Sequence, residues 1–202
     1  MIAVIDYDAG NVMSVVKAIG HLGGSAVLTR DIDRIAEADH VILPGVGAFE
    51  DAMQRLDGYG LSDPIRKLAA DGKPILGICL GLQLFFEGSE ESVNDVRGLG
   101  LLPGRLYRFP ETKGYKIPQI GWNALHIDPE SRLFAGVEEG SYVYFVHSYY
   151  LKAERDEDVA ATSEYNLVFH AAVEHENIFA TQFHPEKSGE VGLRILKNFM
   201  EI

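Results

Sequence analysis

The sequence predicts an α/β fold in which a mixed, mostly parallel central sheet is flanked by helices. The first half alternates short β-branched runs with helical patterns, which is typical of βαβ units around a parallel sheet. The second half has closely spaced strand-like segments, so we expect the sheet to be mixed and continuous. No internal repeat, low-complexity tract or long linker divides the 202 residues. We therefore expect one domain over residues 1–202.

Each expected element of the first half has its own signal. Apolar, β-branched runs predict strands over 1–6, 26–29, 40–43 and 74–78. One apolar face predicts a first helix through Val12, Val15, Val16, Ile19 and Leu22. A further helix is expected over 48–71, interrupted around Asp57-Gly58, and another begins near Leu80.

The second half is expected to be mostly strand and to end in a helix. Strands are predicted over 105–109, 142–151, 159–164, 168–174 and 178–183. The closing helix has one apolar face, made by Val191, Ile195, Leu196, Phe199 and Met200.

Composition and charge exclude several function classes. Of the residues, 47% are apolar, enough for one sizeable core, and the formal net charge of -12 disfavours nucleic acid and anionic membranes as partners. The one cysteine cannot form an internal disulfide, and neither zinc-site spacing nor a Walker A or dinucleotide pattern occurs. The N-terminus lacks signal-peptide features, and residues 74–86 are too short to span a membrane. We expect a cytoplasmic protein without metal or cofactor.

Gly77-Ile78-Cys79-Leu80-Gly81 places a nucleophile between two glycines at a strand-to-helix junction. Glycines two residues away on either side allow a tight turn that strains the central residue and exposes its side chain. The following helix favours thiolate at Cys79. Leu80 N–H would be one oxyanion donor, and the loop Pro44-Gly45-Val46-Gly47 could supply another. Alternatively, Cys79 is a small buried hydrophobic residue, as many lone cysteines are.

His184 and Glu186 are the candidate base and its orienting carboxylate. They follow a predicted strand in Gln182-Phe183-His184-Pro185-Glu186, and period-2 alternation is expected to place both side chains on one side. His184 would move the thiol proton to the leaving amine, while Glu186 would fix the imidazole tautomer. A lone His-x-Glu is more often solvated surface, but together with the cysteine turn it predicts a Cys-His-Glu triad.

With these motifs in this order, the chain resembles the class I (triad) glutamine amidotransferases along essentially its whole length. Within that class it is most similar to the glutaminase subunits of imidazole glycerol phosphate synthases. The motifs that carry this resemblance are Pro44-Gly45-Val46-Gly47, Gly77-Ile78-Cys79-Leu80-Gly81-Leu82-Gln83, Gly121-Trp122-Asn123, Phe145-Val146-His147-Ser148-Tyr149 and Gln182-Phe183-His184-Pro185-Glu186-Lys187-Ser188. The resemblance implies the flavodoxin-like fold of this class.

The resemblance also implies a reaction and a partner. L-Glutamine would be hydrolysed to glutamate and ammonia, and the ammonia would pass through a tunnel to a (β/α)8 cyclase subunit in a heterodimer. There it would give imidazole glycerol phosphate and the aminoimidazole carboxamide ribonucleotide AICAR in histidine biosynthesis. Val46 and Gly47 would form the oxyanion hole with Leu80, and the amide at Gly-Val could turn toward the oxyanion only when the cyclase is loaded.

Further site residues follow from the resemblance by position. Substrate contacts are implied for Gln83, Glu91, Ser148 and Tyr149. The rim on which the cyclase docks is implied for Asn11, Pro118, Ile120, Trp122, Asn123 and Lys187. By residue type alone, Gln83 could be a helix-surface amide, Glu91 part of a solvated acidic face and Trp122 a core ring.

Three alternatives remain open from the sequence. One is the glutaminase subunit of another biosynthetic amidotransferase. A second is a flavodoxin-like cysteine hydrolase, in which the histidine usually follows the cysteine much more closely than His184 follows Cys79. The third is an inactive scaffold, which would have no chemical need to keep all three triad residues.

Overall fold

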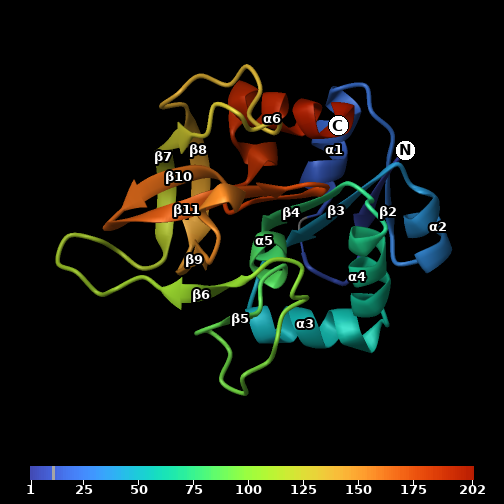
Figure 1. Ribbon diagram of the computed structural model, residues 1–202, viewed down its shortest axis with the longest axis horizontal. Helices are drawn as coiled ribbons and strands as arrows, with labels where there is room; N and C mark the ends of the chain where they lie inside the picture. The colour runs from blue at the N-terminus through green and yellow to red at the C-terminus, as the bar shows by residue number, and fades with distance from the viewer. Residues whose placement is uncertain (11) are drawn as a thin grey trace.

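The computed structural model describes residues 1–10 and 12–202 and has one mixed β-sheet with helices on both faces (Figure 1). The strands are β1 (Ile2–Ile5), β2 (Ala26–Thr29), β3 (His40–Gly45), β4 (Ile75–Cys79), β5 (Gly88–Ser89), β6 (Gly104–Arg108), β7 (Gln119–Ile127), β8 (Tyr142–His147), β9 (Tyr149–Ala153), β10 (Val159–Tyr165), β11 (Leu167–His175) and β12 (Ile178–Thr181). The helices are α1 (Met13–His21), α2 (Ile32–Glu37), α3 (Phe49–Gly58), α4 (Ser62–Ala70), α5 (Leu80–Leu84) and α6 (Gly189–Glu201), with 3-10 turns η1 (Asp156–Asp158) and η2 (Pro185–Lys187). Across the described part of the chain, no helix is long and apolar enough to cross a membrane.

The sheet joins a parallel part to an antiparallel part, as the sequence predicts. Its order is β2-β1-β3-β4-β12-β11-β10-β7-β8, and the first five strands are parallel to their neighbours. From β12 to β8 each pairing is antiparallel. Because parallel strands share one carboxyl edge, β3, β4 and β12 deliver the segments that follow them to the same place.

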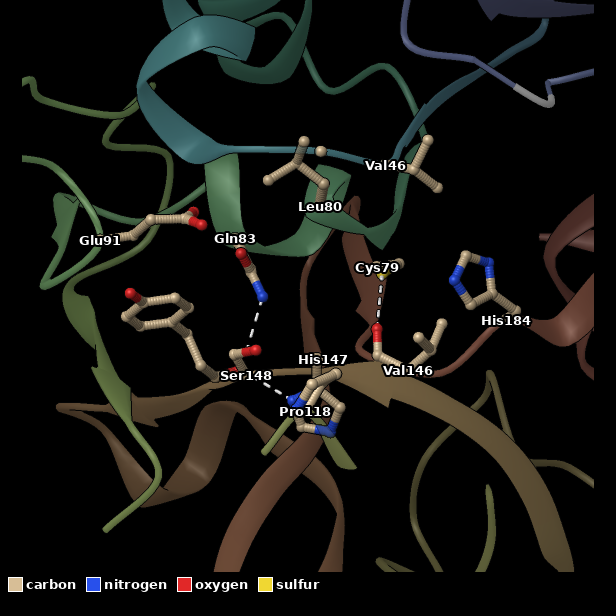
Figure 2. A pocket seen from close by; sticks show the side chains of 12 residues that line it. Val46, Cys79, Leu80, Gln83, Glu91, Pro118, Val146, His147, Ser148 and His184 are labelled. Atoms are coloured by element: carbon tan, nitrogen blue, oxygen red, sulfur yellow. Dashed lines mark hydrogen bonds between the residues drawn. The ribbon is translucent and has the colours of Figure 1, made fainter. Parts of the chain in front are cut away.

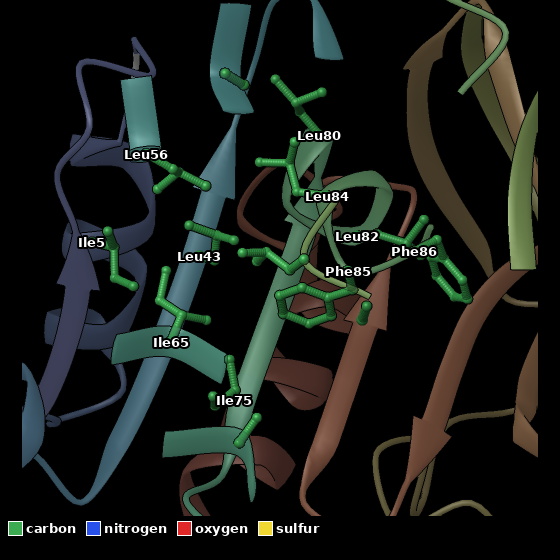
Figure 3. Close-up of a cluster of buried hydrophobic side chains, with 14 of the residues drawn as sticks. Ile5, Leu43, Leu56, Ile65, Ile75, Leu80, Leu82, Leu84, Phe85 and Phe86 are labelled. Carbon is green, nitrogen blue, oxygen red and sulfur yellow. The ribbon is translucent and has the colours of Figure 1, made fainter. Parts of the chain in front are cut away.

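Two apolar layers cover the two faces of the sheet. In β1, Ala3 and Ile5 belong to one buried cluster and Ile2 and Val4 to the other. Helices α3 and α4 lie over the first face and α1 and α6 over the second (Figure 1). Figure 3 shows the first layer, in which residues of β3, β4 and α5 meet those of α3 and α4. Burial on both faces explains why these strands are nearly continuous apolar runs.

The predicted helices are confirmed, with changes in extent. α1 and α6 lie where one apolar face predicts them, and the predicted break in 48–71 separates α3 from α4. The helix expected from Leu80 is present as α5, but it ends after five residues. α2, β5 and β7 add to the expected elements.

Two predictions about the second half are wrong. The single strand expected over 142–151 is two strands, because the chain leaves its partner β7 after His147 and pairs with β6 from Tyr149 onward. The strand expected over 178–183 ends at Thr181, and Glu186 lies in the 3-10 turn η2. Strand alternation therefore does not bring His184 and Glu186 together. One tight turn does.

Candidate active site

Cys79 occupies a strained position at the junction of β4 and α5. Its φ of 56° and ψ of -106° lie where a non-glycine residue is rarely found, at a cost of about 1–3 kcal/mol. The residue is buried, yet it lines a cavity of about 270 Å³ at the carboxyl edge of the parallel strands. The strained turn expected for a nucleophile is confirmed.

The two glycines of this turn allow very close packing. A Cβ on Gly81 would lie 1.8 Å from the backbone oxygen of Leu43, and one on Gly77 would lie 2.8 Å from the carbonyl of Gly81. No larger residue fits at either position without moving backbone. These glycines allow α5 to lie close to β3, and this close packing fixes the position of Cys79 at the cavity.

The turn after β12 brings His184 and Glu186 together. His184 Nδ1 lies 2.8 Å from Glu186 Oε1, and both side chains are buried. Ser188 Oγ donates to the His184 carbonyl at 2.7 Å and accepts from Tyr144 N–H at 3.0 Å, which ties the turn to β8. The pair is therefore held by backbone contacts on both sides.

The contact of His184 with Glu186 sets the imidazole tautomer. An ionised carboxylate can only accept, so the hydrogen lies on Nδ1 and Nε2 is left for the cavity side. Among the residues that the structure describes, His184 Nε2 has no hydrogen-bond partner. Burial alone would lower the pKa of His184, but its interactions with the Cys79 sulfur and the Glu186 carboxylate raise this pKa to about 9. The arrangement favours a protonated imidazole beside the Cys79 sulfur.

The residues expected to form an oxyanion hole line the same cavity. Val46, Gly47 and Leu80 all contribute to its wall. A Cβ on Gly45 would lie 2.3 Å from the hydroxyl of Tyr7, so glycine is needed where β3 ends. Gly47 has a φ of +111°, a conformation that favours glycine. Their role as donors remains a prediction.

The four residues expected to hold substrate also surround the cavity (Figure 2). Gln83 donates from Nε2 to the Tyr149 carbonyl at 3.5 Å and to Gln182 Oε1 at 3.1 Å, which leaves its own oxygen free to accept. Glu91 Oε2 accepts from the Phe49 N–H at 2.8 Å. Gln83 is thus buried in the wall rather than lying on the helix surface.

The expected docking residues lie in different settings. Trp122 is 52% exposed and Ile120 is 64% exposed, so Trp122 is not a core ring. Pro118 lines the cavity beside Cys79, while Asn123 donates to the Glu164 carbonyl at 2.9 Å. Lys187 lines a small neighbouring cavity that also touches Val46 and His184. Asn11 lies outside the described residues.

Two buried polar residues join the site without having been assigned a role from the sequence. His147 Nδ1 donates to the Tyr149 carbonyl at 2.7 Å, and burial lowers its pKa to about 4, so the ring is neutral at pH 7. Gln182 Nε2 lies 3.8 Å from the Cys79 sulfur. Both residues belong to sequence motifs of the site, but a motif does not show which of its side chains face inward.

The arrangement can perform nucleophilic attack by sulfur with proton transfer by imidazole. No group of three or more His, Cys, Asp or Glu side chains within 1–10 and 12–202 is placed to hold a metal ion.

Comparisons with known proteins agree with this chemistry. Residues 3–202 match the family described as "Glutamine amidotransferase class-I". A protein of Wolinella succinogenes is 47% identical over 205 residues, covering 100% of both chains. One of Geobacillus thermodenitrificans is 50% identical over 206 residues, covering 100% of this chain and 96% of that one. Both are named imidazole glycerol phosphate synthase subunit HisH.

The fold is also found in solved structures. The structure of PurLQS from Thermotoga maritima superposes with a TM-score of 0.76 at 21% identity, covering 99% of this chain and 97% of that chain. At this identity the likeness concerns the fold alone. It agrees with a mixed sheet flanked by helices.

Proposed function

The chain belongs to the class I glutamine amidotransferases, and we propose that it is the glutaminase subunit of an imidazole glycerol phosphate synthase. The observation that carries the chemistry is the strained Cys79 at a cavity that His184 also lines, with Glu186 paired to the His184 imidazole. The full-length identity of 47% and 50% to proteins of that name supports this assignment over a sibling amidotransferase.

In the proposed mechanism, the thiolate of Cys79 attacks the side-chain amide carbon of glutamine. The resulting oxyanion is held by the N–H of Leu80 and by an N–H of the Val46–Gly47 segment. His184 protonates the leaving nitrogen, so ammonia departs and a thioester remains on Cys79. His184 then takes a proton from water, whose attack on the thioester releases glutamate. Glu186 keeps the imidazole in the required tautomer throughout.

Substrate specificity is proposed to come from the opposite wall of the cavity. The free oxygen of Gln83 and the carboxylate of Glu91 would receive the α-ammonium group of glutamine. The backbone of Ser148 and Tyr149 would hold the α-carboxylate, and His147 fixes this backbone through the Tyr149 carbonyl. A free amino acid with a side-chain amide suits such a cavity.

Ammonia is proposed to pass to a cyclase subunit with a (β/α)8 barrel, which docks beside the cavity. The exposed apolar side chains of Ile120 and Trp122 favour a protein contact on this surface. Pro118 and Lys187 would extend the interface toward Cys79, and Asn123 and Asn11 complete the proposed set.

The net charge of -12 disfavours nucleic acid as a partner, and a cytoplasmic single-domain subunit is proposed.

The proposed function is tested by mixing the chain with a cyclase subunit and measuring glutamate release from L-glutamine. We expect strong stimulation when the cyclase carries its nucleotide ligand, because the Val46–Gly47 segment would then turn an N–H toward the oxyanion. Equal rates for the isolated chain and the loaded complex would exclude this gating. Absence of glutamate release under all conditions would exclude the glutaminase activity.

A further inference from the structure

Gln182 is a fully buried polar residue that contacts the sulfur of Cys79. It lies just after β12, between the parallel strand and the turn that carries His184. Its side-chain Nε2 is 3.8 Å from Cys79 Sγ, within hydrogen-bond distance for sulfur. The mechanism described above assigns no role to this contact.

The direction in which the Gln182 amide points is fixed by a chain of contacts. The carbonyl of Tyr149 can only accept, so the group of Gln83 that faces it is the NH2. The same NH2 donates to Gln182 at 3.1 Å, so Gln182 must turn its oxygen toward Gln83. Its own NH2 is then left to donate to Cys79. A reversed Gln182 would place two NH2 groups against each other.

A donor at this place favours the ionised sulfur. The carbonyl oxygen of Val146 lies 4.0 Å from Cys79 Sγ, where it accepts from a thiol but repels a thiolate. An N–H that donates to sulfur is strengthened when the sulfur becomes charged. Gln182 therefore offsets the unfavourable effect of the Val146 carbonyl on the thiolate.

Several titratable groups face this sulfur from other elements. His184, with Glu186 behind it, comes from the turn after β12. Tyr7 follows β1, and its pKa is raised by burial and by the charge of Cys79. His147 comes from β8, and Glu91 lines the cavity. Of these, only His184 can supply positive charge to the sulfur at neutral pH, so a neutral donor adds to its effect.

We infer that Gln182 is a further catalytic residue, whose side-chain amide stabilises the thiolate of Cys79 and is oriented for this by the substrate-binding Gln83. The inference deepens the proposed function and rests on it for its catalytic meaning. The ionisation of Cys79 can nevertheless be measured without glutamine or a cyclase. Failure of the inference can thus be told from failure of the proposed function.

The test is the pH dependence of Cys79 alkylation by iodoacetamide in the full chain. Cys79 is the one cysteine of the sequence, so the rate reports this thiol alone. Gln182→Met keeps the side chain's shape and removes the donor. We expect the alkylation midpoint to rise by about one pH unit, the order expected for losing one hydrogen bond to a charged group. Gln182→Glu should raise it further, because a carboxylate repels the thiolate.

The matched control is Thr181→Val, which changes the neighbouring buried residue. Thr181 Oγ1 donates to the Phe183 carbonyl at 3.1 Å and does not contact sulfur, so the midpoint should remain that of the unaltered chain. Thermal unfolding of each variant distinguishes a loss of stability from a change in the ionisation of Cys79. If Gln182→Met and Gln182→Glu lower the unfolding temperature but leave the alkylation midpoint unchanged, Gln182 is structural and the inference is wrong. An equal shift in Thr181→Val would also contradict it.

Discussion

The pKa of His184 is set by burial and by two neighbouring groups of the site. The side chain is buried, which disfavours its charged form, yet it lies between the Glu186 carboxylate and the Cys79 sulfur. The two neighbours outweigh the burial, and the pKa is raised to about 9. Because the folded state binds this proton more tightly than the unfolded chain does, the protonated imidazole stabilises the fold.

Replacing Glu186 by Gln is predicted to lower the pKa of His184, because an amide still accepts from Nδ1–H but carries no charge. The stabilisation from protonated His184 is complete below about pH 6.5 and is lost as pH rises through about 9. The free energy of unfolding of the unaltered chain should therefore exceed that of Glu186→Gln most at about pH 6 and least at about pH 10. NMR titration of the imidazole gives the pKa directly, and equal pKa values in both proteins would disprove the electrostatic role of Glu186.

Glu91→Gln is predicted to raise the KM for glutamine about tenfold while changing kcat much less. The charged contact to the α-ammonium group would be lost in the ground and transition states alike. The amide oxygen can still accept from the Phe49 N–H, so the variant isolates the charge. Steady-state kinetics with a cyclase partner measure both constants. An unchanged KM would remove Glu91 from the substrate site.

Much of the site could be predicted at the scale of residues, because reactive side chains are recognised by type. The sequence identified Cys79, His184 and Glu186; Cys79 and His184 line one cavity, and Glu186 contacts His184 at 2.8 Å. The sequence assigned no role to Gln182, because the residue type alone does not reveal that this glutamine side chain is buried. It also could not show that His147 is neutral, since this depends on packing from several strands.

At the scale of elements, the position of Cys79 depends on how closely α5 approaches β3. The approach is possible because Gly81 has no Cβ to meet the Leu43 carbonyl. A second close contact lies across the site, where a Cβ on Gly192 of α6 would come within 1.9 Å of the Pro185 carbonyl. Nucleophile and base are thus each placed by a glycine that lets a helix touch neighbouring backbone.

Gly81→Ala is predicted to destabilise the protein by about 3 kcal/mol, because the added carbon would overlap backbone that cannot move freely. Gly58→Ala is the matched control. At the end of α3 nothing lies within 4 Å of the added carbon, so this variant should gain up to about 1 kcal/mol. Denaturant unfolding measures both. Equal effects at the two positions would show that the close contact with Leu43 does not matter.

Elements with a strong apolar periodicity could be predicted, whereas strand boundaries that depend on the pairing partner could not. β2 has the predicted bounds, and α1 and α6 follow their apolar faces. The break at Ser148 could not be predicted, because the change of partner from β7 to β6 leaves no mark in local composition. The turn η2 could not be predicted either, since the alternation expected for His184 and Glu186 assumes an extended chain around Pro185.

At the scale of the whole molecule, the sheet brings together segments that are far apart in the sequence. β3 and β4 supply the Val46–Gly47 loop and Cys79, while the neighbouring strand β12 leads to His184. The antiparallel part supplies Ser148 (Figure 2) and Tyr149, which line the same cavity. Fold class and mixed sheet could be predicted from the sequence. The strand order could not, because β12 inserts beside β4 from the far end of the chain.

The most direct test of the account is Cys79→Ala in complex with a cyclase subunit, with imidazole glycerol phosphate formation measured from glutamine and, separately, from ammonium salt. If Cys79 is the nucleophile that releases ammonia, the variant makes no product from glutamine and keeps the ammonia-dependent rate of the unaltered complex. The ammonia-dependent reaction is also the control for folding and assembly. Product formation from glutamine at the unaltered rate by Cys79→Ala would contradict the account.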